Sequence, residues 1–538
     1  MPQPPNLFLE GLQAAENRDF ARADAIAYAM LARDPNDVSG LQIKGFSCFR
    51  RGRNSEALAA FERANQIAPG QPALLYWIGV LYKERGMLAQ AERAFADAVR
   101  RKPQYGEALC HLGETQYYLD RKDEATASFE RAIAAEPQSP VVLSKAARHF
   151  ERVHDLARAR ALAGQALEIA PDYEIALIAR SEIDLREKRH DEIIAALAPI
   201  LSPDAGNERN ASRLYYILAS AYDKTGAYQS AYDAYCASHA LTARIHGARI
   251  AEEQSPLTID SIKRSNEFFA GEDVSAWPPA EKLEGDAPVF LLGFVRSGTT
   301  WLDQILASHP DIMVMEEEDN FVDAWRAFAQ SDDRLQHLKT ASTETINEMR
   351  AAYWKRARAI LREAPNGRLV VDKVPLNTVQ LGLIHRLFPD AKIIFATRDP
   401  RDVILSAFQQ HFEQNYAMFQ FLNFDSAAAY YDLIMSFGMM MREKSVNTFH
   451  DVRYEDVVAD LEGEARRLTA FLDVPWHEAM LAYDETARKR AVRTASATQV
   501  IQRPYSTSIG KWKYYRDEMA SVMPVLAPWV ERFGYDND

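Results

Sequence analysis

A short glycine-containing segment, residues 293–300, has the composition of a phosphate-binding loop. It reads Gly-Phe-Val-Arg-Ser-Gly-Thr-Thr, follows the apolar run at 289–292 and precedes an amphipathic stretch at 301–307. A buried strand, a glycine loop and a helix start, in that order, present backbone N–H groups to a phosphate. The segment therefore predicts a site for a phosphorylated ligand.

One position in this loop narrows the choice of ligand. The two glycines have the spacing of a nucleotide P-loop and Thr300 ends it, but Thr299 stands where an ATPase or GTPase carries lysine. Without that lysine the loop is poorly suited to β- and γ-phosphates, and Arg296 supplies the cation instead. A 5′-phosphosulfate carries less charge than a triphosphate and needs no magnesium bridge. The loop favours a sulfate donor, with a P-loop kinase or NTPase as the alternative.

Two later segments also predict strands that end in charged residues. Residues 369–373 read Leu-Val-Val-Asp-Lys, and residues 392–397 are followed by Arg398 and, eight positions on, Ser406. Arginine offers a fork of donors matched to phosphate oxygens, and the serine lies within the helix that comes next. Under the NTPase alternative, Asp372 would be the carboxylate that holds magnesium.

Together these motifs resemble the sulfotransferase superfamily. The loop with its continuation Trp-Leu, and then Ala-Ser-His-Pro-Asp, is most similar to the branch that holds the protein-tyrosine sulfotransferases and the bacterial proteins that fuse tetratricopeptides to a sulfotransferase domain. The resemblance covers residues 289–512. It implies that 3′-phosphoadenosine 5′-phosphosulfate (PAPS) is the co-substrate and that no metal is needed.

The resemblance also implies a role for individual residues. Arg398 and Ser406 would hold the 3′-phosphate, and Lys373 and Arg296 would stabilise the leaving phosphate. The 5′-phosphosulfate would lie on Ser297, Gly298, Thr299 and Thr300. In the motif Val-Arg-Tyr-Glu-Asp, Tyr454 would contact the adenine, with a core tyrosine as the plainer alternative. In the motif at 505–512, Ser508 and Lys511 would lie on the 3′-phosphate side.

The same resemblance indicates a general base. The branch that sulfates small molecules uses a histidine near residues 373–375, where this chain has none, whereas the tyrosylprotein branch uses a glutamate 21 residues beyond the loop arginine, which is Glu317 here. Glu316 and Glu318 stay as alternatives. The arginines that help to hold an acidic peptide in that branch are missing after Glu318, so the acceptor is left open among protein tyrosine, glycan, lipid headgroup and small molecule.

These residues require a parallel sheet to position them, and a different architecture precedes it. Prolines recur every 34 residues, and three rows of small or aromatic residues keep the same step: Gly45, Gly79, Gly113 and Ala147; Ala57, Ala91, Ala125 and Ala159; Phe61, Phe95 and Phe129. A period of 34 with small residues where paired helices meet is the tetratricopeptide signature. We expect about seven helix pairs that stack on one another.

The predicted organisation is an all-α tetratricopeptide superhelix at 6–250, a linker or junction at 251–286, and an α/β, P-loop-like sulfotransferase domain with a parallel sheet at 287–538. The net charge of −13 argues against a general nucleic-acid binder. No apolar run is long enough to cross a bilayer, and the N-terminus lacks the pattern of a signal peptide, so we expect a cytoplasmic protein.

The repeats lack chemistry of their own, and their groove is expected to hold the acceptor, a polypeptide or a glycan. The alternatives are that they form a homodimer surface, or that the chain is a scaffold whose catalytic half is degenerate. The presence of every donor motif argues against degeneracy.

Overall fold

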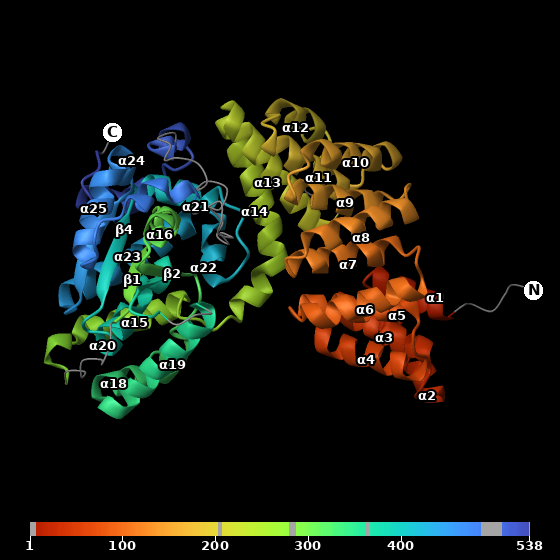
Figure 1. Ribbon diagram of the computed structural model, residues 1–538, viewed down its shortest axis with the longest axis horizontal. Helices are drawn as coiled ribbons and strands as arrows, with labels where there is room; N and C mark the ends of the chain where they lie inside the picture. Colours follow the sequence, from red (N-terminus) through yellow and green to blue (C-terminus); the bar gives the residue numbers. More distant parts are fainter. Residues whose placement is uncertain (1–6, 203–206, 279–286, 362–364, 486–507, 537–538) are drawn as a thin grey trace, which may run out of the picture. The chain divides into compact units, whose positions relative to one another are not determined.

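The computed structural model describes residues 7–202, 207–278, 287–361, 365–485 and 508–536. The chain divides into two compact units, residues 1–200 and 201–538 (Figure 1), and each is described by itself. In the described residues, no helix is both long enough and apolar enough to cross a membrane.

The first unit is built from consecutive helix pairs that stack in chain order. Its helices are α1 (Leu7–Glu16), α2 (Phe20–Arg33), α3 (Val38–Arg50), α4 (Asn54–Ile67), α5 (Pro72–Glu84), α6 (Leu88–Arg101), α7 (Gly106–Tyr118), α8 (Lys122–Ala135), α9 (Pro140–Arg152), α10 (Leu156–Ile169), α11 (Glu174–Arg186) and α12 (His190–Leu197). The alanine row of the 34-residue period is fully buried between the helices of each pair. The helical repeat architecture expected from the period is confirmed.

Within three of these pairs a glycine of the first helix faces a phenylalanine of the second. A Cβ at the glycine would lie 2.7–2.9 Å from the ring, which is too close for an unshifted side chain, in the pairs Gly45–Phe61, Gly79–Phe95 and Gly113–Phe129. The fourth pair has alanine in both rows, Ala147 and Ala163, and both are fully buried. A phenylalanine therefore packs against each glycine, which has no Cβ, and an alanine packs against the alanine of the fourth pair.

The second unit begins with a further helix pair, α13 (Glu208–Thr225) and α14 (Tyr228–Ala251). Although these helices continue the repeats along the chain, they pack against later parts of the second unit. His239 Nδ1 lies 3.0 Å from the carbonyl oxygen of Leu422, and the Tyr232 ring stacks on Phe408 at 5.7 Å. The predicted boundary at residue 250 stays a prediction, but the seventh helix pair belongs to the same compact unit as the elements after it.

The remaining elements form an α/β fold. The strands are β1 (Val289–Gly293), β2 (Ile312–Glu316), β3 (Leu369–Lys373), β4 (Lys392–Thr397) and β5 (Thr448–Arg453). The helices are α15 (Ile259–Gly271), α16 (Thr299–Ala307), α17 (Val322–Phe328), α18 (Asp332–Thr340), α19 (Thr343–Leu361), α20 (Leu381–Leu387), α21 (Pro400–Phe408), α22 (Tyr416–Phe419), α23 (Phe424–Lys444), α24 (Tyr454–Ala459), α25 (Leu461–Leu472) and α28 (Met523–Arg532). Short 3₁₀ turns are η1 (Val274–Ala276), η2 (Pro375–Gln380), η3 (Gln420–Leu422), η4 (Glu478–Ala482) and η6 (Lys511–Tyr515).

The five strands form one sheet in the order β2-β3-β1-β4-β5, and every neighbouring pair is parallel. Strand β1 is at the centre, and all five of its residues are buried. Phe290 and Leu292 join one core and Val289 and Leu291 another, because alternate side chains point to opposite faces. Helices cover both faces, as parallel sheets require, and the predicted fold class is confirmed.

The glycine–phenylalanine match generates a double-mutant prediction. Phe95→Ala should cost about 3–5 kcal/mol because it leaves a cavity, and Gly79→Ala about 1–3 kcal/mol because it overpacks the pair. The double variant recreates the alanine pairing of residues 147 and 163, so it should be less destabilised than the sum of the two, by about 0.5–3 kcal/mol. Hydrogen exchange of the amides in α5 and α6 measures these free energies.

The control for this cycle is Gly164→Ala. Gly164 lies inside α10, and a Cβ added there would come no closer than 4.0 Å to its nearest neighbour, Arg180 Nη1. The added methyl group should therefore stabilise the helix by about 0.5–1 kcal/mol. Strict additivity at Gly79 and Phe95 would contradict the proposed size match.

Candidate active site

Every strand of the sheet ends at or just before a residue that the sequence placed in the site. The parallel registers pair Glu316 with Lys373, Leu291 with Lys373, Gly293 with Ala396 and Thr397 with Arg453. The carboxyl ends of the strands therefore lie along one edge. At this edge stand the loop at 293–300 after β1, Glu317 after β2, Lys373 ending β3, Arg398 after β4 and Tyr454 after β5. Ligands of open α/β folds bind at such an edge.

The loop after β1 requires its two glycines for space as well as for backbone conformation. Gly293 has φ +147°, and a Cβ there would collide with the carbonyl oxygen of Ala396. Gly298 has φ +89°, and a Cβ would lie 2.6 Å from Tyr454 Cδ2. Helix α16 begins directly afterwards at Thr299. Because the first N–H groups of a helix point along its axis without acceptors in a preceding turn, this helix end suits an anion.

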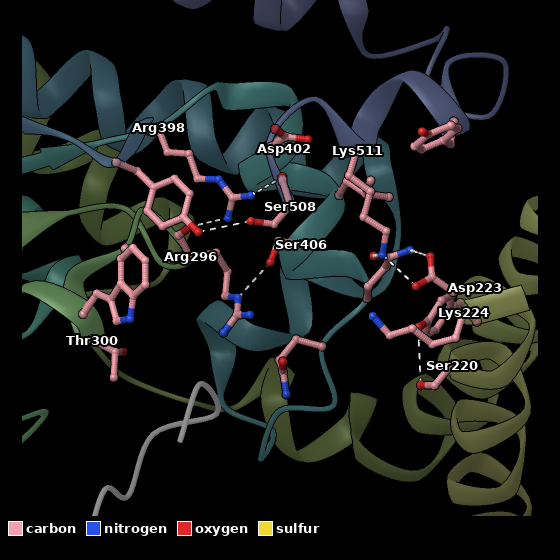
Figure 2. Close-up of a pocket in the computed structure, with 18 of the residues that line it drawn as sticks. Ser220, Asp223, Lys224, Arg296, Thr300, Arg398, Asp402, Ser406, Ser508 and Lys511 are labelled. Atoms are coloured by element: carbon pink, nitrogen blue, oxygen red, sulfur yellow. Dashed lines mark hydrogen bonds and ion pairs between the residues drawn. The ribbon is translucent and has the colours of Figure 1, made fainter. Parts of the chain in front are cut away.

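A cavity of about 390 Å³ opens in front of this loop (Figure 2). It is lined by most of the residues predicted to bind the donor: Arg296, Gly298, Thr299, Thr300, Arg398, Ser406, Tyr454, Ser508 and Lys511. Ser297, within the loop, is buried and does not line the cavity; its N–H donates to the Phe294 carbonyl oxygen at 3.3 Å. The structure thus brings nine predicted binding residues to one hollow.

Two arginines form one wall of the cavity. Arg296 donates from Nε to Ser406 Oγ at 3.0 Å, which joins the loop to helix α21. Arg398 donates from Nη2 to the Ser508 carbonyl oxygen at 2.6 Å and from Nη1 to the Arg296 carbonyl oxygen at 3.3 Å. Arg398 Nε is buried and has no hydrogen-bond partner among the described residues. A buried guanidinium with an unsatisfied donor is suited to an anionic ligand.

Tyr454 lines the same cavity and contacts one of these arginines. The Arg398 guanidinium lies 4.6 Å from its ring centroid, and the Trp301 ring stacks on it at 5.6 Å and 30°. Its hydroxyl lies 3.1 Å from Ser508 Oγ. The predicted contact of Tyr454 with adenine stays a prediction. Trp301 also lines the cavity. The sequence analysis did not predict it as a binding residue, although its position directly after the loop indicates that it lies near the site.

Glu317 and Lys373 form a second group at the same edge of the sheet. Lys373 Nζ is 2.8 Å from Glu317 Oε1 and 3.5 Å from Asp303 Oδ2, and the lysine side chain is fully buried. Glu317 adopts φ +45°, its N–H donates to the Lys373 carbonyl oxygen at 2.9 Å, and its side chain is 46% exposed. The predicted base and the predicted leaving-group lysine are therefore direct neighbours.

The alternative bases are placed differently. Glu316 Oε1 accepts a hydrogen bond from Gln304 Nε2 at 3.4 Å, and Glu318 is exposed. Glu317 combines partial exposure with a close ion pair to Lys373. The choice of Glu317 stays a prediction, but its geometry is the most suitable.

Asp372, the carboxylate that an NTPase would need, points into the core. Its Oδ2 accepts hydrogen bonds from Tyr353 Oη at 2.8 Å and from Asn320 Nδ2 at 3.1 Å. Burial raises the pKa of Asp372 to about 6. Because it is engaged on the opposite side of β3 from Lys373, this carboxylate is poorly placed for a magnesium ion at the loop.

Lys511 lines the cavity but is held by partners that the sequence did not indicate. Its Nζ lies 2.7 Å from Asp223 Oδ2 on α13 and 2.8 Å from Gln409 Oε1. The other lining residues that the sequence did not indicate are Asp402, Leu405, Gln410 and Tyr514 and, on α13 and α14, Tyr216, Ser220, Lys224, Tyr228 and Tyr235. Those helices were assigned to the repeats, so nothing in their pattern indicated a site. Residues 505–507 of the same motif lie outside the described residues.

Comparison with known proteins finds separate matches for the helical repeats and for the α/β elements. Residues 288–478 match the sulfotransferase family model, and residues 49–109 and 106–139 match tetratricopeptide repeat models. An uncharacterized protein of Aquifex aeolicus (strain VF5) is 24% identical to this chain, and the match covers 93% of this chain and 71% of the length of that protein.

Two named relatives match a smaller part. Protein-tyrosine sulfotransferase A of Caenorhabditis elegans is 24% identical over 46% of this chain and 67% of its own length. Human protein-tyrosine sulfotransferase 1 is 25% identical over 54% of this chain and 80% of its own length. The chain therefore has a segment that matches tetratricopeptide repeat models, followed by a segment that matches the sulfotransferase family model.

Proposed function

We propose that the second unit transfers a sulfuryl group from PAPS to an acceptor hydroxyl. The observation that carries this proposal is the convergence of Arg296, Arg398 and the first turn of α16 on one cavity, in a loop that has Thr299 at the lysine position of NTPases. Two guanidinium groups and a helix N-terminus suit a ligand with separate 5′- and 3′-anionic groups. The similarity to protein-tyrosine sulfotransferases supports the same conclusion.

In the proposed reaction, the acceptor oxygen attacks the sulfur of PAPS and its proton passes to Glu317. The bond between sulfur and the bridging oxygen breaks, and 3′-phosphoadenosine 5′-phosphate leaves with the electron pair. Lys373 and Arg296 stabilise the negative charge that develops on the leaving oxygens. Glu317 Oε1 and Lys373 Nζ are 2.8 Å apart, so the group that accepts the proton and a group that stabilises the leaving oxygen lie beside each other at this edge of the sheet.

The rival functions have less support. A kinase or NTPase would need a lysine in the loop and a carboxylate at the metal, but Thr299 and the core-facing Asp372 supply neither. A degenerate scaffold would have no use for a fully buried Lys373 or for a buried, unsatisfied Arg398 Nε, because buried charges of this kind destabilise a fold. The unsatisfied Arg398 donor is explained when an anion in the cavity completes the site.

The repeats suggest a capacity for protein interaction, and we propose that they present a polypeptide acceptor to the catalytic unit. A weakly bound polypeptide would reach a high effective concentration at Glu317, typically about millimolar for a short connection. A glycan acceptor, a homodimer surface and a cytoplasmic location stay predictions. A metal-independent reaction is likewise part of the proposal.

The first prediction concerns the donor. The protein should bind 3′-phosphoadenosine 5′-phosphate in the presence of EDTA, because arginines rather than magnesium neutralise the ligand, and it should not hydrolyse ATP. Isothermal calorimetry with both nucleotides measures this. ATP turnover that depends on magnesium and disappears with Thr300→Ala would contradict the sulfotransferase proposal.

The second prediction concerns the base. Glu317→Gln should reduce transfer by about 10²- to 10⁴-fold, because the amide keeps the shape but cannot take the proton. Affinity for 3′-phosphoadenosine 5′-phosphate should be unchanged or tighter, since an anion near the donor is removed. Glu318→Gln, the exposed neighbour, is the matched control. Full activity in Glu317→Gln together with loss in Glu318→Gln would move the base by one residue.

The third prediction concerns the acceptor. Since α13 and α14 pack with the α/β elements, the repeats should be removed at residue 200 rather than at residue 250. A chain that lacks residues 1–200 should bind the donor normally and sulfate a small phenol at an unchanged rate, but it should lose most of its turnover of the natural polypeptide. Equal turnover of that polypeptide by both chains would show that the repeats do not present it.

A further inference from the structure

We propose that Asp223, on helix α13, is a positioning residue of the donor site, which holds Lys511 so that its ammonium group faces the 3′-phosphate. The inference rests on the proposed function and deepens it. It assigns to a helix of the repeat pattern a part in binding the co-substrate. Neither the sulfotransferase match, which begins at residue 288, nor the tetratricopeptide matches, which end at residue 139, include Asp223.

Two contacts with described residues account for two of the donors of the Lys511 side chain. An ammonium group has three N–H donors. One contacts Asp223 Oδ2 at 2.7 Å and a second contacts Gln409 Oε1 at 2.8 Å. The Lys511 side chain is 23% exposed and lines the same cavity as Arg398 and Ser508. In the view of Figure 2, Ser508 lies between Arg398 and Lys511. In the part of the chain that the structure describes, this ammonium has no third hydrogen-bond partner, and we assign its remaining donor to an anion in the cavity.

Asp223 is itself held firmly. Its Oδ1 accepts hydrogen bonds from Tyr515 Oη at 2.7 Å and from Gln409 Nε2 at 3.1 Å, and only 8% of the residue is exposed. Burial by itself would raise the pKa of Asp223, but the ammonium of Lys511 and the hydroxyl of Tyr515 lower it overall. The carboxylate is thus ionised and fixed in orientation, as a residue that positions a cation must be.

A second carboxylate holds the backbone on both sides of Lys511. Asp402 Oδ2 accepts a hydrogen bond from the Gly510 N–H at 2.6 Å, and Oδ1 accepts one from the Trp512 N–H at 2.9 Å. Gly510 has φ +70°, the left-handed conformation that starts the turn η6. Lys511 is therefore positioned twice, through its backbone by α21 and through its side chain by α13.

Helix α14 adds an aromatic contact to the same turn. Tyr228, at its first position, stacks on Tyr514 at 4.8 Å and meets Tyr515 edge-on at 5.3 Å. The helix pair thus contacts the segment that carries Lys511 from two sides. This packing gives a physical reason why α13 and α14 belong to the second unit.

A purely structural ion pair is the simpler alternative, in which Asp223 only fastens α13 to the C-terminal segment. The two roles differ in their effect on ligand binding. A positioning residue affects the affinity for the 3′-phosphate and leaves the rest of the nucleotide unchanged. A structural residue affects all nucleotides alike, or none.

The test compares 3′-phosphoadenosine 5′-phosphate with adenosine 5′-phosphate, which lacks the 3′-phosphate, by calorimetry on the full chain. Asp223→Asn should weaken the first ligand by about tenfold or more, since it misdirects a charge-assisted hydrogen bond, and should leave the second unchanged. Asp233→Asn is the matched control, because Asp233 is exposed on α14 and accepts a hydrogen bond from Gln229 Nε2 of the same helix. It should bind both ligands like the parent.

A second variant makes the result independent of a general effect of Asp223→Asn on folding. Lys511→Met should weaken the 3′-phosphorylated ligand alone, and adding Asp223→Asn to it should have little further effect, because the residue to be positioned is gone. Equal losses for both ligands in Asp223→Asn, unchanged binding, or additive losses in the double variant would overturn the inference. If the parent chain binds neither nucleotide, the proposed function itself fails, and this inference fails with it.

Discussion

The site depends on the parallel pairing of five strands. In a parallel sheet every strand ends at the same edge, so one polar residue after each strand is enough to assemble a site from distant parts of the chain. The loop after β1 and Tyr454 after β5 are separated by more than 150 residues in sequence, yet a Cβ on Gly298 would touch the Tyr454 ring. Helices on both faces keep this sheet buried and leave only its edge for chemistry.

Local patterns in the sequence predicted the strands and the helix pairs. Apolar runs that end in Lys373 or before Arg398 mark strands whose bounds the structure reproduces at 369–373 and 392–397. The 34-residue step predicted the paired helices. Contacts between elements were beyond such reasoning, because no local pattern tells which helix will face Lys511 or that Asp372 will turn to Tyr353. Asp223 was therefore assigned only to a repeat.

The site also contains buried charged groups that the stability of the fold does not require. Lys373 is fully buried, with Glu317 and Asp303 beside it, and Arg398 has a buried donor without a partner in the described residues. Isolated buried charges are destabilising, and ion pairs offset only part of that effect. The helix pairs of the first unit are instead matched by size, through alanine, glycine and phenylalanine. The fully buried Lys373 and the unpaired donor of Arg398 therefore support the proposed catalytic role of the α/β elements.

Helices α13 and α14 connect these two kinds of structure. The sequence predicts a seventh helix pair here, although the 34-residue period weakens after Pro171. The side chains of these helices line the cavity and contact the turn that carries Lys511. A repeat normally buries its apolar face on its neighbours. Here part of that face is covered by Phe408 and Phe424, which stack on Tyr232. A catalytic unit cut at the end of the repeat pattern would expose these rings and lose Asp223, so the end of the repeat period is not the limit of the functional unit.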